Sequence, residues 1–307
     1  MTSRQWRWAL SSLAGIAGLL FLVDAGSYAL AQDASGAVEY RDIPFIGSRN
    51  LIWIVAQIHL LFAGFVLGVP IFGLTCEYIG YRTKDARYDR LAKEFTKLLT
   101  ASYATTALFG GILLFCLIGL YPKLWNYMND QFFATFMIYG ILFLLETPTL
   151  YLYWYGWDAM QNRKKLHLFL GLLLNFFGFL IMIVSNSWAT FQASPVIVAD
   201  TMTYWERVWA VVHNPTWWPV NIHRLIANVV LGGFICGAYA GVRYLGAKTQ
   251  EERAHYDWMG YIGNFIGIFG LLPLPFAGYW LMREIYEYNQ QMGITLMGGF
   301  LSWLFIL

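Results

Sequence analysis

Charge is what this sequence has least of. Only 12% of its 307 residues are Asp, Glu, Lys or Arg, and the net charge is +2, whereas soluble domains carry about 25% charged residues. With 58% hydrophobic residues, this composition predicts a polytopic membrane protein. No nucleic-acid partner is expected, because such partners are bound through concentrated positive charge.

Cysteine is also scarce, and its spacing argues against several cofactor sites. Cys76, Cys116 and Cys236 are far apart, and no CxxC or CxxCH motif is present. Zinc, iron–sulfur and covalently attached c-type haem sites are therefore not expected. The sequence also lacks an obvious internal repeat and a matching pair of interrupted apolar segments, which disfavours a transporter.

Long apolar runs make up most of the chain. A run of at least about 18 apolar residues can cross a bilayer as a helix. Such runs lie at roughly 8–31, 51–75, 98–120, 132–155, 166–188, 221–244 and 258–282, and another begins near Gly293. We therefore predict an all-α integral membrane protein, a multi-pass helical bundle of about 7–8 transmembrane helices. The amphipathic stretch 203–213 is expected to lie at the outer membrane interface.

Positive charge sets the expected orientation. If the amino terminus is inside, 14 of the 20 Lys and Arg residues fall in inner segments, as the positive-inside rule requires. We predict a bacterial cytoplasmic (inner) membrane protein with a cytoplasmic amino terminus. Residues 1–32 are expected to form a retained signal-anchor helix, 47–290 the main bundle, and 291–307 the start of a further span.

Two histidines lie at similar depth in separate spans. His59 and His223 both follow the outer ends of their apolar runs. A histidine within a span often hydrogen-bonds across helices, and each residue alone is open to that interpretation. Two at one depth favour haem ligation, because imidazole is the usual ligand of b-type haem and needs no covalent motif. Arg224 follows His223 directly, and its guanidinium is suited to a haem propionate.

A carboxylate lies deep in the fourth run. Glu146, in FLLETP, falls near the middle of 132–155, and a buried carboxylate is a functional hypothesis by default. Glu146 is a candidate proton relay or a neighbour of a haem iron. The alternative is a helix–helix hydrogen bond beside a kink at Pro148. Met282 and Glu284 are further candidate iron ligands, with packing and surface roles as their alternatives.

Charged residues near the ends of the runs have simpler interpretations. Arg49, at the outer start of its run, is suited to a propionate or a lipid phosphate, and snorkelling is the alternative. Glu77, His167 and His255 lie beside the basic inner loops and are expected to be solvated.

Four segments carry a resemblance to a known family. They are GSRNLIWIVAQIHLLFAGFVLG (47–68), ILFLLETPTLYLYWYGWD (141–158), IVSNSWATFQASP (183–195) and NPTWWPVNIH (214–223). In this order they resemble subunit I of cytochrome bd-type quinol oxidases, and the resemblance covers roughly 47–240.

The resemblance implies roles for four residues. His59 matches a histidine that ligates a high-spin haem, and His223 matches the ligand of the low-spin haem b. Glu146 matches a carboxylate on the proton route, and Arg49 matches an arginine of the same helix as the first histidine. The sequence departs from the family at Tyr139, where a second carboxylate is usual, and the family's long hydrophilic quinol-binding loop is not visible.

The resemblance also implies a function for the bundle. The chain is similar to a haem-binding membrane subunit of a respiratory electron-transfer complex. Quinol or a periplasmic cytochrome c is the implied electron donor, and oxygen is a candidate electron acceptor. One or more haem b groups are implied, with haem d and quinone as further candidate ligands, and other membrane subunits and lipid as partners. Whether the chain takes part in an oxidoreductase active site stays open, because a haem-poor structural anchor of a redox complex would share this scaffold.

Overall fold

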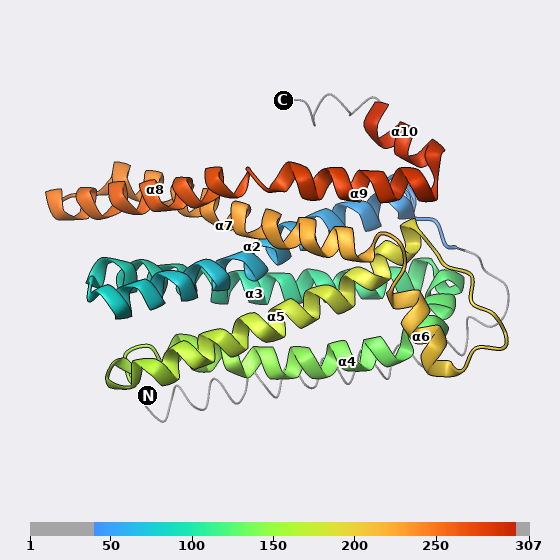
Figure 1. Cartoon of the computed structure of the whole chain (residues 1–307), viewed down its shortest axis with the longest axis horizontal. Helices are drawn as coiled ribbons and strands as arrows, with labels where there is room; N and C mark the ends of the chain where they lie inside the picture. Colours follow the sequence, from blue (N-terminus) through green and yellow to red (C-terminus); the bar gives the residue numbers. More distant parts are fainter. Residues whose placement is uncertain (1–39, 299–307) are drawn as a thin grey trace.

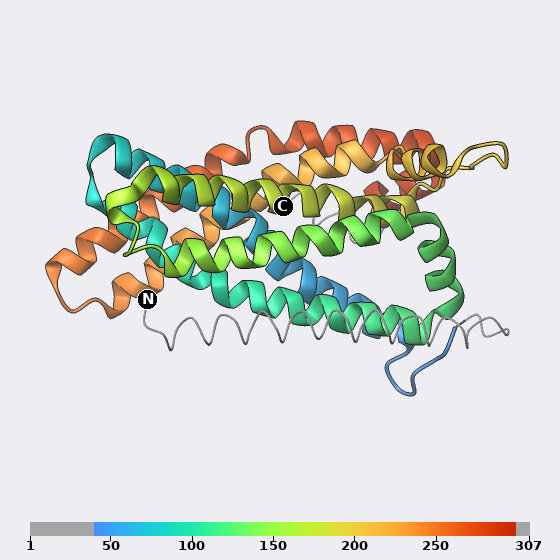
Figure 2. The same ribbon diagram turned by 90° about the horizontal axis from the view of Figure 1, so that it is seen from below.

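The protein is a bundle of long helices that lie side by side (Figures 1 and 2). The computed structural model describes residues 40–298, so the predicted signal-anchor at 1–32 and the last residues of the expected final span lie outside it. Six spans within 40–298 are long and apolar enough to cross a membrane. They are α2 (Ser48–Thr83), α3 (Ala86–Leu120), α4 (Pro122–Tyr155), η1 with α5 (Gln161–Arg163, Lys164–Ala193), α7 (Trp217–Gly246), and α8 with α9 (Gln250–Gly270, Leu274–Tyr288). Each of these contains one of the apolar runs found in the sequence, and the prediction of an all-α, multi-pass bundle is confirmed.

Helix α2 lies at the centre of the packing. It contacts α3, α5 and α7, while α7 also contacts α8 and α9. The α2–α7 crossing is close because Gly68 has no side chain: a Cβ there would lie 1.9 Å from the backbone oxygen of Asn228. Small residues allow this approach between membrane helices, where dispersion contacts and interhelical hydrogen bonds drive association. The crossing joins the two helices that carry His59 and His223.

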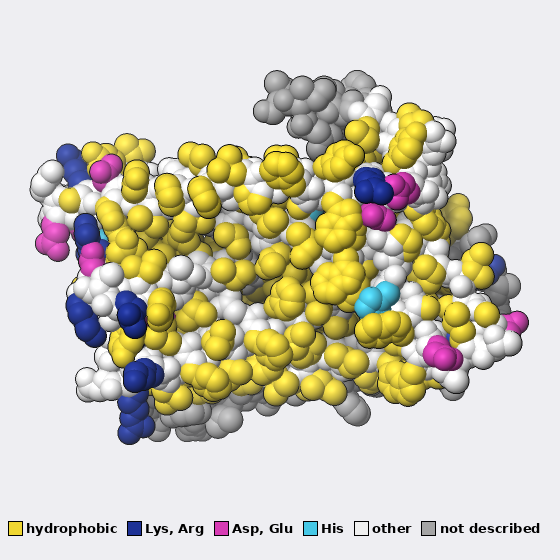
Figure 3. Space-filling view, in the orientation of Figure 1, with side chains coloured by type: hydrophobic (Ala, Val, Ile, Leu, Met, Phe, Trp, Pro, Cys, Tyr) yellow, Lys and Arg dark blue, Asp and Glu magenta, His cyan; other side chains and the backbone are white. Residues whose placement is uncertain are grey.

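The two ends of the bundle differ in charge. Lys and Arg side chains gather at the end where α2 meets α3, α4 meets α5 and α7 meets α8 (Figure 3). We call this the basic end. Helices α2 and α7 both begin at the opposite end, so His59 and His223 lie in the half of the bundle away from the basic end.

A short helix covers part of that opposite end. The stretch expected to be interfacial forms α6 (Tyr204–Val212), and a capping box of Thr203 and Glu206 begins it. The backbone N–H of Thr203 donates to the Glu206 carboxylate and holds its pKa below the usual value, because an accepted hydrogen bond favours the ionised form. A further short helix, α10 (Gln290–Gly298), follows α9.

The expectation that Glu77, His167 and His255 are solvated is wrong. Their exposed fractions are 0%, 0% and 5%. Helix α2 continues past its apolar run to Thr83, so Glu77 is still inside the bundle. The ends of the apolar runs therefore do not mark the ends of the packed core.

Candidate functional site

His59 is held on α2 in one tautomer. Its Nδ1 lies 3.0 Å from the backbone oxygen of Thr106 on α3. A carbonyl only accepts hydrogen bonds, so Nδ1 carries the proton and Nε2 of the neutral ring is the bare nitrogen. Histidines that bind metals are commonly oriented in this way. The ring also faces Gly110, where a Cβ would come within 2.9 Å of Cε1.

His223 presents a ring nitrogen without a partner. Its Nδ1 is buried and has no hydrogen bond within residues 40–298. An unsatisfied buried polar atom is costly, about 1–3 kcal/mol. This nitrogen therefore fits a group that the protein would bind beside it.

Arg224 is held by an amide instead of a carboxylate. Its Nη1 donates to the side-chain oxygen of Asn186 on α5. The Asn186 amide nitrogen in turn donates to Oδ1 of Asn221 at 2.7 Å, which fixes the orientation of Asn186. The half-buried guanidinium forms no ion pair with the part of the chain that the structure describes. A carboxylate from a ligand could form an ion pair with this guanidinium, and a haem propionate is such a carboxylate.

These residues fit a haem by their donor chemistry. Within the described part of the chain, α2 offers a bare imidazole nitrogen, and α7 offers a buried imidazole nitrogen without a hydrogen bond and a guanidinium without a carboxylate. These groups are complementary to iron and propionate. The three side chains come from helices that the structure packs together.

Glu146 is buried at the contact between α4 and α5. Its exposed fraction is 5%, and at Gly178 of α5 a Cβ would lie 2.9 Å from its Oε1. A cavity of about 20 Å³ lies beside Glu146 and is also lined by Asn175 and Met182. That volume holds about one water molecule. The Oδ1 atom of Asn175 is buried without a hydrogen bond from residues 40–298, and such a water would satisfy it.

Three further candidates, Arg49, Met282 and Glu284, have no hydrogen bond or ion pair to these residues in the described part of the chain. Arg49 is exposed near the start of α2, and Met282 is half-buried on α9. Glu284 accepts a hydrogen bond from Nε1 of Trp280, one turn earlier on its own helix, at 3.2 Å. No hydrogen bond or ion pair between described residues joins these three to His59 or His223, and their roles as ligands stay predictions.

The sequence interpretation missed the asparagines that position Arg224. Asn186 and Asn221 are 1% exposed or less, although both lie at the outer ends of apolar runs. The presence of two asparagines inside apolar runs was itself a sign of a polar contact, because a buried amide inside a membrane span needs a polar partner. Pairing the two asparagines would have required knowing which faces of α5 and α7 meet.

Asn186→Leu is expected to destabilise the protein by about 1–3 kcal/mol, because the Arg224 guanidinium loses its acceptor. The loss should appear as a lower midpoint of thermal unfolding in detergent. Ser185→Ala is the matched control, since this neighbouring hydroxyl donates only to the Met182 carbonyl of its own helix. Equal midpoints for the two variants would show that Asn186 does not hold Arg224.

The chain is similar in sequence to known proteins. A family model described as cytochrome bd terminal oxidase subunit I matches residues 48–300. The chain is 23% identical over 249 residues to a Bacillus subtilis (strain 168) protein named as a cytochrome bd menaquinol oxidase subunit I; the match covers 80% of this chain and 55% of that protein.

A solved structure has the same fold. The bd oxidase from Geobacillus thermodenitrificans superposes with a TM-score of 0.70 at 18% identity, over 79% of this chain and 56% of that one. The chain thus spans about half the length of the relatives that it matches.

Proposed function

The chain belongs to the cytochrome bd terminal oxidase subunit I family, and we therefore propose that it is a haem-binding membrane subunit of a respiratory electron-transfer complex. The observation that carries the proposal is the state of the two imidazoles. His59 leaves Nε2 bare because Nδ1 is bound to Thr106, and His223 has a buried nitrogen without a described partner. Two such nitrogens on adjoining helices favour ligation over simple helix–helix hydrogen bonds.

Each site residue has a distinct task in this proposal. His59 and His223 hold haem iron, with Met282 and Glu284 as further candidate ligands, and Arg224 and Arg49 pair with propionates. Haem b is the proposed cofactor, with haem d as a second type, and a bound haem supplies an iron that exchanges one electron at a time. The protein keeps the ligands oriented and surrounds them with apolar side chains.

Glu146 has the task of carrying protons. It is buried with a cavity that has room for a water molecule, and a carboxyl group in that setting can give and take a proton through the water. Reduction of oxygen consumes protons as well as electrons. We propose oxygen as the final acceptor, and quinol or a periplasmic cytochrome c as the donor.

The proposed setting is the bacterial inner membrane. The basic end would face the cytoplasm, as the positive-inside rule expects, and the amino terminus would lie on the same side. The haems would lie toward the outer face, and other membrane subunits of the complex would pack against the lipid-exposed helices. A haem-poor anchor subunit is the alternative that an experiment must reject.

The test is a dithionite-reduced minus air-oxidised visible spectrum of the purified protein, with and without carbon monoxide. We expect sharp b-type bands, together with a shift on addition of carbon monoxide that reports an iron with an open position. Bands without that shift would indicate an electron relay that does not reduce oxygen. A protein without haem bands would be the structural anchor.

A further inference from the structure

A second group of titratable side chains is buried at the basic end, away from His59 and His223. Glu77 of α2 and His167 of α5 are both 0% exposed, and Tyr153 of α4 is 2% exposed. The proposed function does not use any of them. Three helices contribute to this group, so it also ties α2, α4 and α5 together.

The hydrogen bonds of His167 show where protons must lie. Its Nε2 is 2.9 Å from the backbone oxygen of Tyr153, so Nε2 carries a proton. Its Nδ1 is 2.5 Å from Oε1 of Glu77. Two lone pairs would repel at that distance, so one more proton lies between the ring and the carboxylate. We call this contact the Glu77–His167 pair.

The surrounding charges are balanced only when that proton is present. Lys164 lies 2.8 Å from Oε1 of Glu77 and also contacts Asp89 of α3. Tyr153 donates its hydroxyl to Oε2 of Glu77 at 2.5 Å, and it carries no charge. Two carboxylates, one ammonium and one shared proton sum to zero, which a buried cluster requires. Without the proton the cluster would carry one negative charge.

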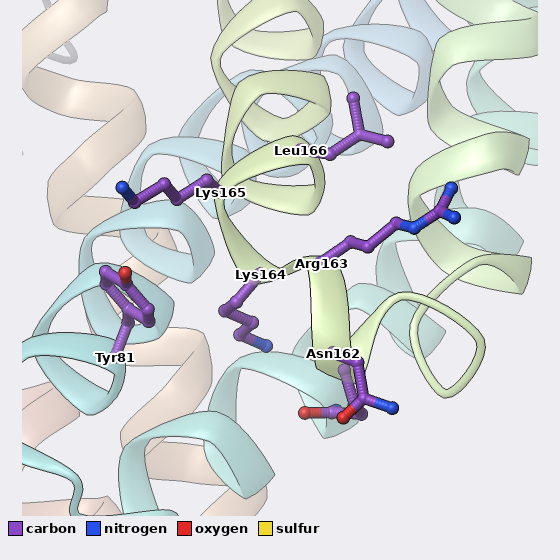
Figure 4. A pocket seen from close by; sticks show the side chains of 7 residues that line it. Tyr81, Asn162, Arg163, Lys164, Lys165 and Leu166 are labelled. Atoms are coloured by element: carbon purple, nitrogen blue, oxygen red, sulfur yellow. The ribbon is translucent and has the colours of Figure 1, made fainter.

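Lys164 links the pair to an open cavity. A cavity of about 460 Å³ at the basic end is lined by Tyr81 and by residues 161–166 (Figure 4). Lys164 belongs to this lining and also bonds Glu77. Lys164 therefore contacts both the cavity at the basic end and the buried pair.

Helix α5 connects the pair to the surroundings of Glu146. Asn175 follows His167 by eight residues, a rise of about 12 Å. Asn175 lines the small cavity beside Glu146, and its Nδ2 donates to the backbone oxygen of Pro70 on α2 at 3.1 Å. Helices α2 and α5 thus carry the proton-holding pair at the basic end, and together with Glu146 of α4 they line the small cavity in the membrane interior.

We propose that the Glu77–His167 pair is the proton-loading site through which protons from the basic end reach Glu146. This inference rests on the proposed function, because it names the source of the protons that Glu146 delivers. In the transfer, the proton between Nδ1 and Oε1 moves through water to the Glu146 carboxylate. The pair then takes one proton from water at the basic end, which restores its charge.

The test is the rate of proton uptake by the native complex in phosphatidylcholine vesicles, followed with a pH-sensitive dye while reduced enzyme is mixed with oxygen. His167→Gln can keep the hydrogen bond to the Tyr153 carbonyl but has no ring nitrogen that can share a proton with Glu77. We expect at least about tenfold slower uptake with unchanged haem bands, because a positioned proton-transfer group contributes about 100-fold or more. His255→Gln is the control, since this buried histidine at the same end faces Glu94 at 3.8 Å and should leave uptake at the wild-type rate.

The possible failures can be told apart. Uptake at the wild-type rate in His167→Gln, with haem bands intact, overturns the loading site and leaves the proposed function standing. Wild-type protein without haem bands overturns the proposed function, whatever the pair does. If His167→Gln does not fold, nitrogen-15 NMR of histidine-labelled wild-type protein shows whether Nδ1 of His167 shares a proton with Glu77. A signal from a proton shared between Nδ1 and Glu77 is expected, and a bare Nδ1 overturns the proposal.

Discussion

Replacing His223 with alanine is expected to remove the low-spin haem b bands from the spectrum of the purified protein. The substitution deletes the buried ring nitrogen that has no partner among the described residues and leaves Arg224 with its amide partner. Loss of an outer-sphere partner of a metal ligand typically costs 10–100-fold in affinity, so loss of the ligand should cost more than about 100-fold. The reduced-minus-oxidised spectrum per mole of protein measures the effect.

His213→Ala is the matched control for this experiment. His213 precedes the same helix by a few residues, and its Nδ1 bonds the backbone oxygen of Trp209 within its own segment. Because that ring is already engaged locally, its removal should leave the bands unchanged. Retention of full haem b in His223→Ala, with the protein folded, would contradict the assignment of His223 as ligand.

The spans were predictable from sequence because each one contains an unbroken apolar run. Their ends were not, and the largest differences lie at the α2–α3 hairpin. The apolar runs end at Thr75 and resume at Leu98, whereas the helices continue to Thr83 and restart at Ala86. Polar residues there stay helical because the two helices pack against each other at the hairpin, where a Cβ at Gly80 would lie 3.1 Å from Cβ of Tyr88. A hydropathy pattern shows which residues are apolar, but it does not show that these polar residues are held in a contact between two helices.

The candidate site could be proposed from its residue types, whereas the hydrogen-bond partners of those residues could not be. Imidazole, guanidinium and carboxyl groups inside apolar runs indicate their chemistry by position, and His59, His223, Arg224 and Glu146 are candidates on that ground. The acceptors that orient them depend on how the helices are rotated about their axes. For the same reason Glu77, far from His167 in the chain, was not recognised as its neighbour.

Gly68→Ala is expected to be the most damaging single-methyl change in the bundle. The added Cβ would lie 1.9 Å from the backbone oxygen of Asn228 and 2.5 Å from its carbonyl carbon. Backbone atoms cannot rotate away as a side chain can, so α2 and α7 must separate. Overpacking typically costs 1–3 kcal/mol, and a backbone clash should reach at least about 3 kcal/mol. Folded yield and the midpoint of thermal unfolding in detergent both report this loss.

The same change should also weaken haem binding, since the crossing at Gly68 sets how the helices of His59 and His223 approach each other. Gly111→Ala is the control, because no atom of residues 40–298 lies within 4 Å of a Cβ at that helical position. Alanine there should be neutral or stabilise the helix by about 0.5–1 kcal/mol. Equal stability of the two variants would mean that α2 and α7 do not cross at Gly68. Reduced haem content in Gly68→Ala alone would show that the ligands depend on this crossing.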